Sequence, residues 1–171
     1  MTPEFSRTES LSTIGAGERR VAIEADAQER AALARRFGLI SIDRLVAEMG
    51  VRRDATGIIA HGHLSGAVVQ PCSVTGAPVP ATVEEDFTIR FVAEGDVSGD
   101  EVELSDEDCD TVFYSGGAID LGEAAAETLA LALDPFPRSP GAEDALRDAG
   151  VLSEGETGPF AALAKLNLPK D

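Results

Sequence analysis

Apolar side chains alternate with polar or small ones along residues 21–25, 58–72 and 82–91, and this period of two is typical of a half-buried strand. The last segment alternates most regularly. Four of its side chains are expected to face the core: Val83, Phe87, Ile89 and Phe91. Residues 39–53 fit a helical stripe or a strand face; we favour a strand, because a turn at 54–57 would make a hairpin. The pattern predicts a two-faced antiparallel sheet.

Capping signals predict the helices. The first is expected at residues 26–37 and the second at 120–133, and each begins with a capping box, an acid followed three residues later by Glu. Shorter helices are predicted at 142–149 and from residue 159 onward. The fold class is therefore α+β: a hairpin-rich antiparallel sheet, either open or barrel-like, packed with about four helices.

The chain carries a large and unevenly distributed negative charge. Its 31 Asp and Glu residues outnumber 14 Lys and Arg residues, which gives a net charge of −17. Residues 1–60 are neutral, so residues 61–171 carry all of this charge. Such a field repels phosphate backbones and attracts basic proteins. We therefore expect a basic protein partner, no DNA, and no extended grip on RNA.

Residues 93–110 concentrate this charge, with nine acids and no basic residue. A segment of this composition buries too little apolar surface to offset the entropy of ordering, so we predict a flexible acidic loop. The whole chain of 171 residues, 43% of them apolar, has the size of a single domain, 1–171.

Three features bear on the compartment. The N-terminus lacks the layout of a signal peptide, and no apolar run approaches the roughly 20 residues of a membrane span. The two cysteines, Cys72 and Cys109, form no disulfide framework. We expect a cytoplasmic protein with reduced thiols and no membrane partner.

Two histidines and one cysteine are the candidates for chemistry. His61 and His63 lie on the same side of a predicted strand and could bind a metal if a third ligand converged; we favour the alternative, a solvated sheet face. Cys72 has no second sulfur or basic neighbour in sequence to lower its pKa, so we expect it to pack with Leu64 and Val68. No phosphate-binding or nucleophile motif occurs. We predict no catalytic residue, no metal and no cofactor.

Four sequence stretches, spread along nearly the whole chain, are informative when they are taken together. They are Glu4-Phe-Ser-Arg7, Gly62-His-Leu-Ser-Gly-Ala-Val-Val-Gln-Pro-Cys-Ser-Val-Thr75, Gly117-Ala-Ile-Asp-Leu-Gly-Glu-Ala-Ala-Ala-Glu-Thr-Leu-Ala-Leu-Ala-Leu-Asp-Pro-Phe-Pro137 and Pro159-Phe-Ala-Ala-Leu-Ala-Lys-Leu166. Together, and in this order, they resemble the YceD family, the large ribosomal RNA subunit accumulation proteins, in its alphaproteobacterial form. The resemblance implies a non-enzymatic role in accumulating large-subunit ribosomal RNA, and hence in ribosome assembly.

The same resemblance implies roles for particular residues. Cys72 and Glu127 match the family's recurring Cys and Glu, and we assign Gly66, Gln70 and Cys72 to a structural motif in the second stretch. Many family members carry a second Cys three residues after the first, where this chain has Thr75. This departure argues against an essential metal or disulfide at the position.

The leading hypothesis joins the ribosomal role to the negative field: an acidic surface that binds a basic ribosomal protein or assembly factor before it meets RNA. We assign this surface to Asp120, Glu123 and Glu127, which lie within about 60° of arc on the predicted helix. Glu127 ranks highest, because the capping box already explains the other two.

Two alternatives stay open. Ribosomal RNA could bind directly to a patch of eight arginines in the N-terminal part. These are Arg19, Arg20, Arg30, Arg35, Arg36, Arg44, Arg52 and Arg53. The other alternative is a metal-dependent hydrolase, which needs His61, His63 and an acid to converge in one pocket.

Overall fold

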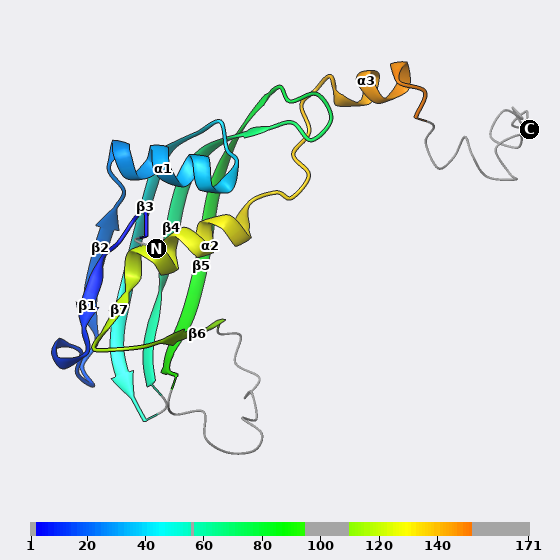
Figure 1. Cartoon of the computed structure of the whole chain (residues 1–171). Coiled ribbons are helices and arrows are strands. Elements are labelled where there is room, and N and C mark those ends of the chain that lie inside the picture. The colour runs from blue at the N-terminus through cyan, green and yellow to red at the C-terminus, as the bar shows by residue number, and fades with distance from the viewer. Residues whose placement is uncertain (1–2, 56, 95–109, 152–171) are drawn as a thin grey trace, which may run out of the picture. The chain divides into compact units, whose positions relative to one another are not determined.

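The computed structural model describes residues 3–55, 57–94 and 110–151 (Figure 1). In chain order its elements are β1 (Thr8–Ser10), the single 3₁₀ turn η1 (Leu11–Thr13), β2 (Arg19–Glu24), α1 (Ala27–Phe37), β3 (Ser41–Asp54), β4 (Gly57–Pro71), β5 (Pro78–Ala93), β6 (Asp110–Tyr114), β7 (Ala118–Asp120), α2 (Leu121–Ala132) and α3 (Ala142–Asp148). The α+β class is confirmed. The helix predicted from residue 159, and nearly all of the predicted acidic loop, lie outside the described residues.

Five strands form one sheet in the order β2-β3-β4-β5-β6, while β1 and β7 form a separate pair. β2 and β3 are antiparallel, and so are β3 and β4, which pair Glu48 with His63 and Ala47 with Leu64. The strand interpretation of residues 39–53 is therefore confirmed. The turn that joins β3 to β4 lies between Asp54 and its partner Gly57, as the sequence pattern predicts.

Two details of the predicted sheet are wrong. β6 runs parallel to β5, with Ile89 beside Asp110 and Ala93 beside Tyr114, whereas the alternation predicts an antiparallel sheet throughout. A parallel neighbour needs a connection of about a dozen residues or more, and residues 94–109 provide one. Within the described residues the sheet is also open, with β2 and β6 as its edges, so the barrel-like alternative is not realised there.

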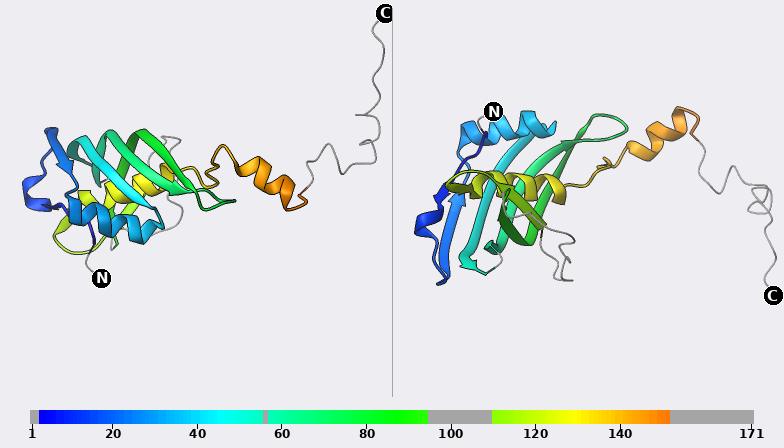
Figure 2. Two further views of the ribbon diagram at one scale, coloured as in Figure 1. Left: turned by 90° about the horizontal axis from the view of Figure 1, so that it is seen from above. Right: turned by 60° about the horizontal axis from the view of Figure 1, so that its bottom comes forward.

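Helices α1 and α2 cover the same face of this sheet (Figure 1, Figure 2). The four β5 side chains predicted to face the core are all buried. They belong to one cluster with Leu33 of α1 and Leu129 of α2, whose side chains are fully buried. Full burial of an aliphatic or Phe side chain contributes about 1.5–3 kcal/mol, so this layer between sheet and helices is the main source of stability.

The two capping boxes have different outcomes. At α1 the prediction is confirmed: Asp26 accepts from the amide of Glu29 at 2.9 Å, and Glu29 accepts from the amide of Asp26 at 2.8 Å. At α2 only half of the box forms. Asp120 accepts from the amide of Glu123 at 3.2 Å, but the Glu123 carboxylate binds Arg36 of α1 instead of returning to the Asp120 amide.

The N-terminal segment attaches α2 to the rest of the fold. Phe5 is only 1% exposed, and Thr8 pairs with Asp120 across the short β1 and β7 sheet. Gly122 lies so close to this segment that a Cβ atom there would stand 2.6 Å from the Phe5 carbonyl oxygen and 2.9 Å from the Arg7 amide. Glycine is thus required at this point by close backbone approach.

The chain separates into two compact units, residues 1–70 with 80–135 and residues 71–79 with 136–171. The first contains the five-stranded sheet, except for the ends of β4 and β5, together with α1 and α2. The second contains the loop between β4 and β5, and α3. That residues 1–171 behave as a single domain stays a prediction.

Replacing Gly122 by Ala should destabilise the protein, although Ala favours a helix by about 1 kcal/mol over Gly. The added methyl group meets backbone atoms that cannot rotate away, and overpacking of this kind costs about 1–3 kcal/mol. Urea denaturation measures the change. Gly117→Ala is the control, because its Cβ would meet nothing within 4 Å; equal stabilities of the two variants would contradict the close approach.

Candidate functional site

The three acids predicted to bind a partner, Asp120 at the N-cap of α2 and Glu123 and Glu127 within α2, have different surroundings. Asp120 accepts hydrogen bonds from the N-terminal segment, including the Arg7 amide at 2.8 Å. Glu123 binds Arg36 through both oxygens, at 2.7 and 3.0 Å. Glu127 is exposed and has no ion-pair partner among the residues that the structure describes. The first two carboxylates are therefore engaged within the fold, whereas the described residues offer the third no ion pair.

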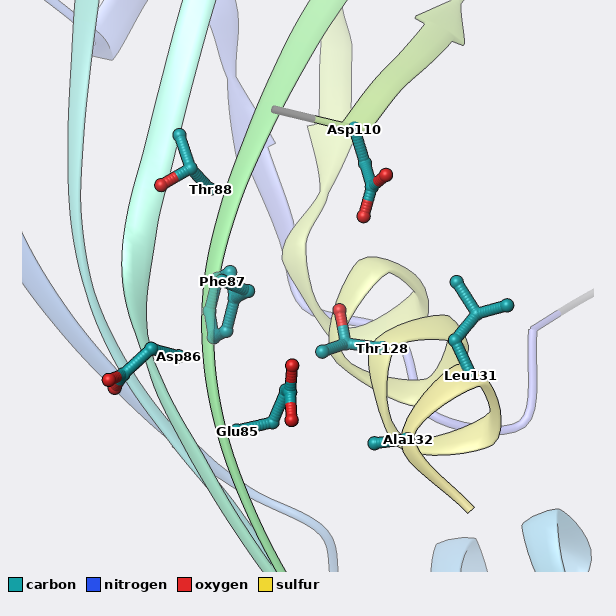
Figure 3. A pocket seen from close by; sticks show the side chains of 8 residues that line it. All are labelled: Glu85, Asp86, Phe87, Thr88, Asp110, Thr128, Leu131 and Ala132. Atoms are coloured by element: carbon teal, nitrogen blue, oxygen red, sulfur yellow. The ribbon is translucent and has the colours of Figure 1, made fainter. Parts of the chain in front are cut away.

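A groove of about 250 Å³ lies between β5 and α2 (Figure 3). Its lining residues are Glu85, Asp86, Phe87, Thr88, Asp110, Thr128, Leu131 and Ala132. Figure 3 shows the Glu85 side chain directed toward α2, whereas Asp86 and Thr88 point to the other side of the strand. Leu131 is 79% exposed and forms part of the helix wall. The groove thus combines carboxylates with apolar surface.

Glu85 occupies a position that the β5 alternation assigns to the core face. Its neighbours on that face, Val83 and Phe87, are both buried, but Glu85 itself is exposed. In the described part of the chain its carboxylate has no ion-pair or hydrogen-bond partner, and the same is true of Asp110. Sequence reasoning missed this residue. The available signal was a single acid within the apolar side of the most regular strand.

The opposite face of the sheet carries a charged cluster around His63. Its Nδ1 lies 2.7 Å from Asp86 Oδ1 and its Nε2 lies 2.7 Å from Glu84 Oε2. Ser65 donates to Glu84 at 2.9 Å and accepts from Arg44 at 3.0 Å. Two carboxylates favour the doubly protonated ring, so they raise the pKa of His63, with Glu84 making the largest contribution.

His61 and His63 do not converge on a common site. His61 Nε2 lies 3.4 Å from Glu18 of the segment before β2, whereas both ring nitrogens of His63 face carboxylates of β5. Across residues 3–55, 57–94 and 110–151 no group of His, Cys, Asp and Glu is arranged to hold a metal ion. The geometry that the hydrolase alternative needs is not found in this part of the chain.

Six of the eight arginines in the alternative RNA patch bind oxygen atoms of the protein. Arg19, Arg36 and Arg52 form ion pairs with acids. Arg30 and Arg53 donate to backbone carbonyls. Arg44 donates to the Ser65 hydroxyl as above, so most of these cations are already satisfied within the fold.

Cys72 is buried, with 4% of its surface exposed, and its sulfur accepts hydrogen bonds from two backbone amides. The donors are the amides of Ser139 at 3.3 Å and of Thr75 at 3.5 Å. Hydrogen bonds from Ser139, first from its side chain and then from its amide, and from Thr75 lower the pKa of the thiol to about 6. No basic residue lies near Cys72 in the sequence to lower this pKa. The sequence does not predict the amide donors, because they come close to the sulfur only when the loop is folded.

The other two motif residues lie toward the end of β4. A Cβ atom at Gly66 would stand 3.2 Å from Leu129 Cδ1, so this position bounds the packing of α2. Gln70 is the one buried polar side chain among the described residues, and its Nε2 donates to the Asp134 carbonyl at 2.9 Å. This bond ties β4 to the chain just after α2.

Together these features define an α+β protein with an open, mainly antiparallel sheet, two helices on one face, and acidic clusters at its surface. The chain belongs to the family described as large ribosomal RNA subunit accumulation protein YceD, whose sequence model matches residues 60–167. The matched part includes Gly66, Gln70, Cys72 and the acids of α2. Neither the curated proteins nor the solved structures gave a match to the chain.

No helix in the described residues is long and apolar enough to cross a membrane.

The pKa of His63 should lie above the ordinary value of about 6.5 and fall toward it in Glu84→Gln. Because the folded pKa is the raised one, the cluster stabilises the fold fully below pH about 6.5, and this contribution is lost as pH rises through the folded pKa. NMR titration of the His63 ring protons measures this pKa in the wild type and in Glu84→Gln. An unchanged pKa in Glu84→Gln would show that the carboxylate does not act on the ring.

The Cys72 thiol should titrate at about 6 in the folded protein and near its ordinary value of about 8.5 when unfolded. Its thiolate therefore stabilises the fold above pH about 8.5, and this contribution is lost as pH falls through about 6. Thiolate absorbance in a Cys109→Ser background, with and without urea, measures both values. The same midpoint in both states would contradict the hydrogen bonds from Ser139 and Thr75 to the sulfur.

Proposed function

We propose that this chain supports the accumulation of large-subunit ribosomal RNA, and hence ribosome assembly, by binding a basic protein through its acidic surface. The description of its family supports the ribosomal part of this proposal. The role is one of binding and not of catalysis, and it takes place in the cytoplasm, where ribosomes are assembled. The partner is a basic ribosomal protein or assembly factor, so contact with ribosomal RNA is indirect.

The observation that supports a basic partner is the contrast between cations that are paired within the fold and acids that have no ion-pair partner in the described residues. Arg7 and Arg36 each bind a glutamate within the fold, at 2.7 Å in both cases. Glu85, Asp110 and Glu127 have no ion-pair partner in the described residues, and the chain has a net charge of −17. An uncompensated negative field speeds the encounter with Lys-rich and Arg-rich chains and makes binding sensitive to salt.

Direct RNA binding has weaker support. Affinity for a phosphate backbone requires lysine and arginine side chains that displace counterions. Most of the candidate arginines donate to acids or carbonyls of the protein itself, as described above. The residues from 61 onward add only five basic side chains against 22 acids. These charges disfavour an extended RNA interface.

Deletion of the gene should lower the ratio of large-subunit to small-subunit ribosomal RNA, and expression of the wild-type chain should restore it. Affinity purification of the tagged chain from these cells should yield Lys-rich and Arg-rich ribosomal proteins or assembly factors, identified by mass spectrometry. An unchanged ribosomal RNA ratio in the deletion strain would contradict the ribosomal role. A yield dominated by RNA after removal of proteins would support direct RNA binding instead.

Replacing Glu127 by Gln should weaken binding of the purified partner by about two- to fivefold at low salt, the range expected for one exposed ion pair. The difference should disappear at high salt, because screening removes it. Isothermal titration calorimetry measures the affinities. Glu143→Gln on α3 is the matched control, since Glu143 is also an exposed helical acid. Unchanged affinity and full rescue of ribosomal RNA by Glu127→Gln would remove Glu127 from the site.

A further inference from the structure

One edge of β5 is only partly paired. β6 pairs with residues 89–93 of β5, and the described part of the chain places no strand beside residues 81–88 on that side. The amide and carbonyl groups of such an edge are a template for another extended chain. Pro80, which has no amide hydrogen, limits the usable edge at the start.

The groove described above opens beside this edge. Asp110 is the first residue of β6 and pairs with Ile89, so the described pairing on this side of β5 begins at Ile89 and leaves residues 81–88 beside it. Glu85 lies four residues before Ile89 along β5, with its side chain directed toward α2 (Figure 3). Asp110 therefore lies at one end of the position that such a strand would occupy, and Glu85 lies near its middle.

The lining of the groove favours a side chain with an apolar stem and a cationic end. Leu131, Ala132 and Phe87 supply apolar surface, and Glu85 and Asp110 supply carboxylates. Lysine and arginine match this lining, because their methylene stems pack on apolar groups while their charged ends remain in polar surroundings. A volume of about 250 Å³ is smaller than the usual range for cofactor or drug-sized ligands, about 300–1,000 Å³, and suits one side chain.

We propose that an extended basic segment of the protein partner adds as a strand to the edge of β5 at residues 81–88 and places a lysine or arginine side chain in the groove. Main-chain hydrogen bonds to the edge hold the segment, and the pocket selects one of its alternating side chains. Glu85 and Asp110 bind the cation across the groove. This inference rests on the proposed function, since it specifies how the acidic surface meets a basic partner.

The negative charge of β5 favours a basic segment at this edge over a second copy of the same chain. Glu84, Glu85 and Asp86 follow one another along the part of the edge that has no described neighbour, and a second β5 strand would bring the same three acids beside them. Like charges on neighbouring strands are destabilising, and charged residues are the common means of preventing edges from pairing with themselves. A basic segment is attracted by the same acids.

A fluorescent peptide of alternating lysine and valine is the probe, and fluorescence anisotropy with the full-length chain measures binding at low salt. Glu85→Gln and Asp110→Asn should each weaken binding by about tenfold, the loss expected when a charge-assisted hydrogen bond is removed. Glu48→Gln, an exposed acid on the other face of the sheet, should change it by less than twofold. Melting temperatures of the variants should match the wild type, because both groove acids are exposed.

Two further measurements test the strand addition. A peptide of alternating lysine and proline has the same charge but fewer amide donors, and it should bind at least tenfold more weakly. NMR amide shifts caused by the lysine and valine peptide should be concentrated at residues 81–88. Equal binding of the proline peptide, or shifts confined to other elements, would overturn the assignment to this edge.

The remaining outcomes separate this inference from the proposed function. Peptide binding that is equally tight in wild type, Glu85→Gln and Asp110→Asn would overturn the groove and leave an acidic surface elsewhere as the partner site. No binding of any basic peptide would overturn both proposals. A uridine oligonucleotide that binds the wild type and is lost in Glu85→Gln would assign the groove to RNA, and self-association that the peptide reverses would assign the edge to a second copy.

Discussion

The carboxylate of Asp120 joins parts of the chain that are more than a hundred residues apart. It accepts hydrogen bonds from the Ser6 hydroxyl and the Arg7 amide of the N-terminal segment, and from the amides of Gly122 and Glu123 at the start of α2. Each bond to a charged group contributes about 1.5–3 kcal/mol. One side chain thus caps a helix and anchors the segment that closes over it. The segment in turn brings Arg7 to Glu29, the N3 residue of the α1 capping box.

This anchor also decides where the groove lies. Close contact between Gly122 and the N-terminal backbone fixes the first turn of α2, and Leu129 packs into the core beside Gly66 of β4. The inner face between them consists largely of alanines, so the helix lies close to the sheet. With the helix fixed in this way, Thr128 and Leu131 of its last turns stand opposite β5 and form the second wall of the groove.

The sequence predicts the elements that depend on local patterns and misses the contacts between distant segments. Alternation identifies β4 and β5 and their buried side chains, and the box at Asp26 and Glu29 identifies the start of α1. The pattern at residues 39–53 leaves helix and strand open, and only the predicted turn at 54–57 favours β3. The half-formed box at α2 is beyond such reasoning, because Glu123 has an alternative partner, Arg36, that only the packing of two helices provides. The same limit applies to the amide donors of Cys72. Glu127 is recognisable from sequence, whereas Glu85 becomes significant only when α2 is placed opposite its strand.

The three consecutive acids of β5 show why composition alone is a poor guide to a charged site. The pleat sends Glu84 and Asp86 to the face where His63 lies between them, and Glu85 to the face of α2. His63 is cationic below its raised pKa, so it offsets part of the charge on the outer face as pH falls, while no described cation offsets Glu85. Residues that form one acidic run in the sequence therefore separate into a partly compensated cluster and a carboxylate that no described cation offsets. This carboxylate lies beside the part of the β5 edge that has no described neighbour, and this is where we propose that the basic segment binds.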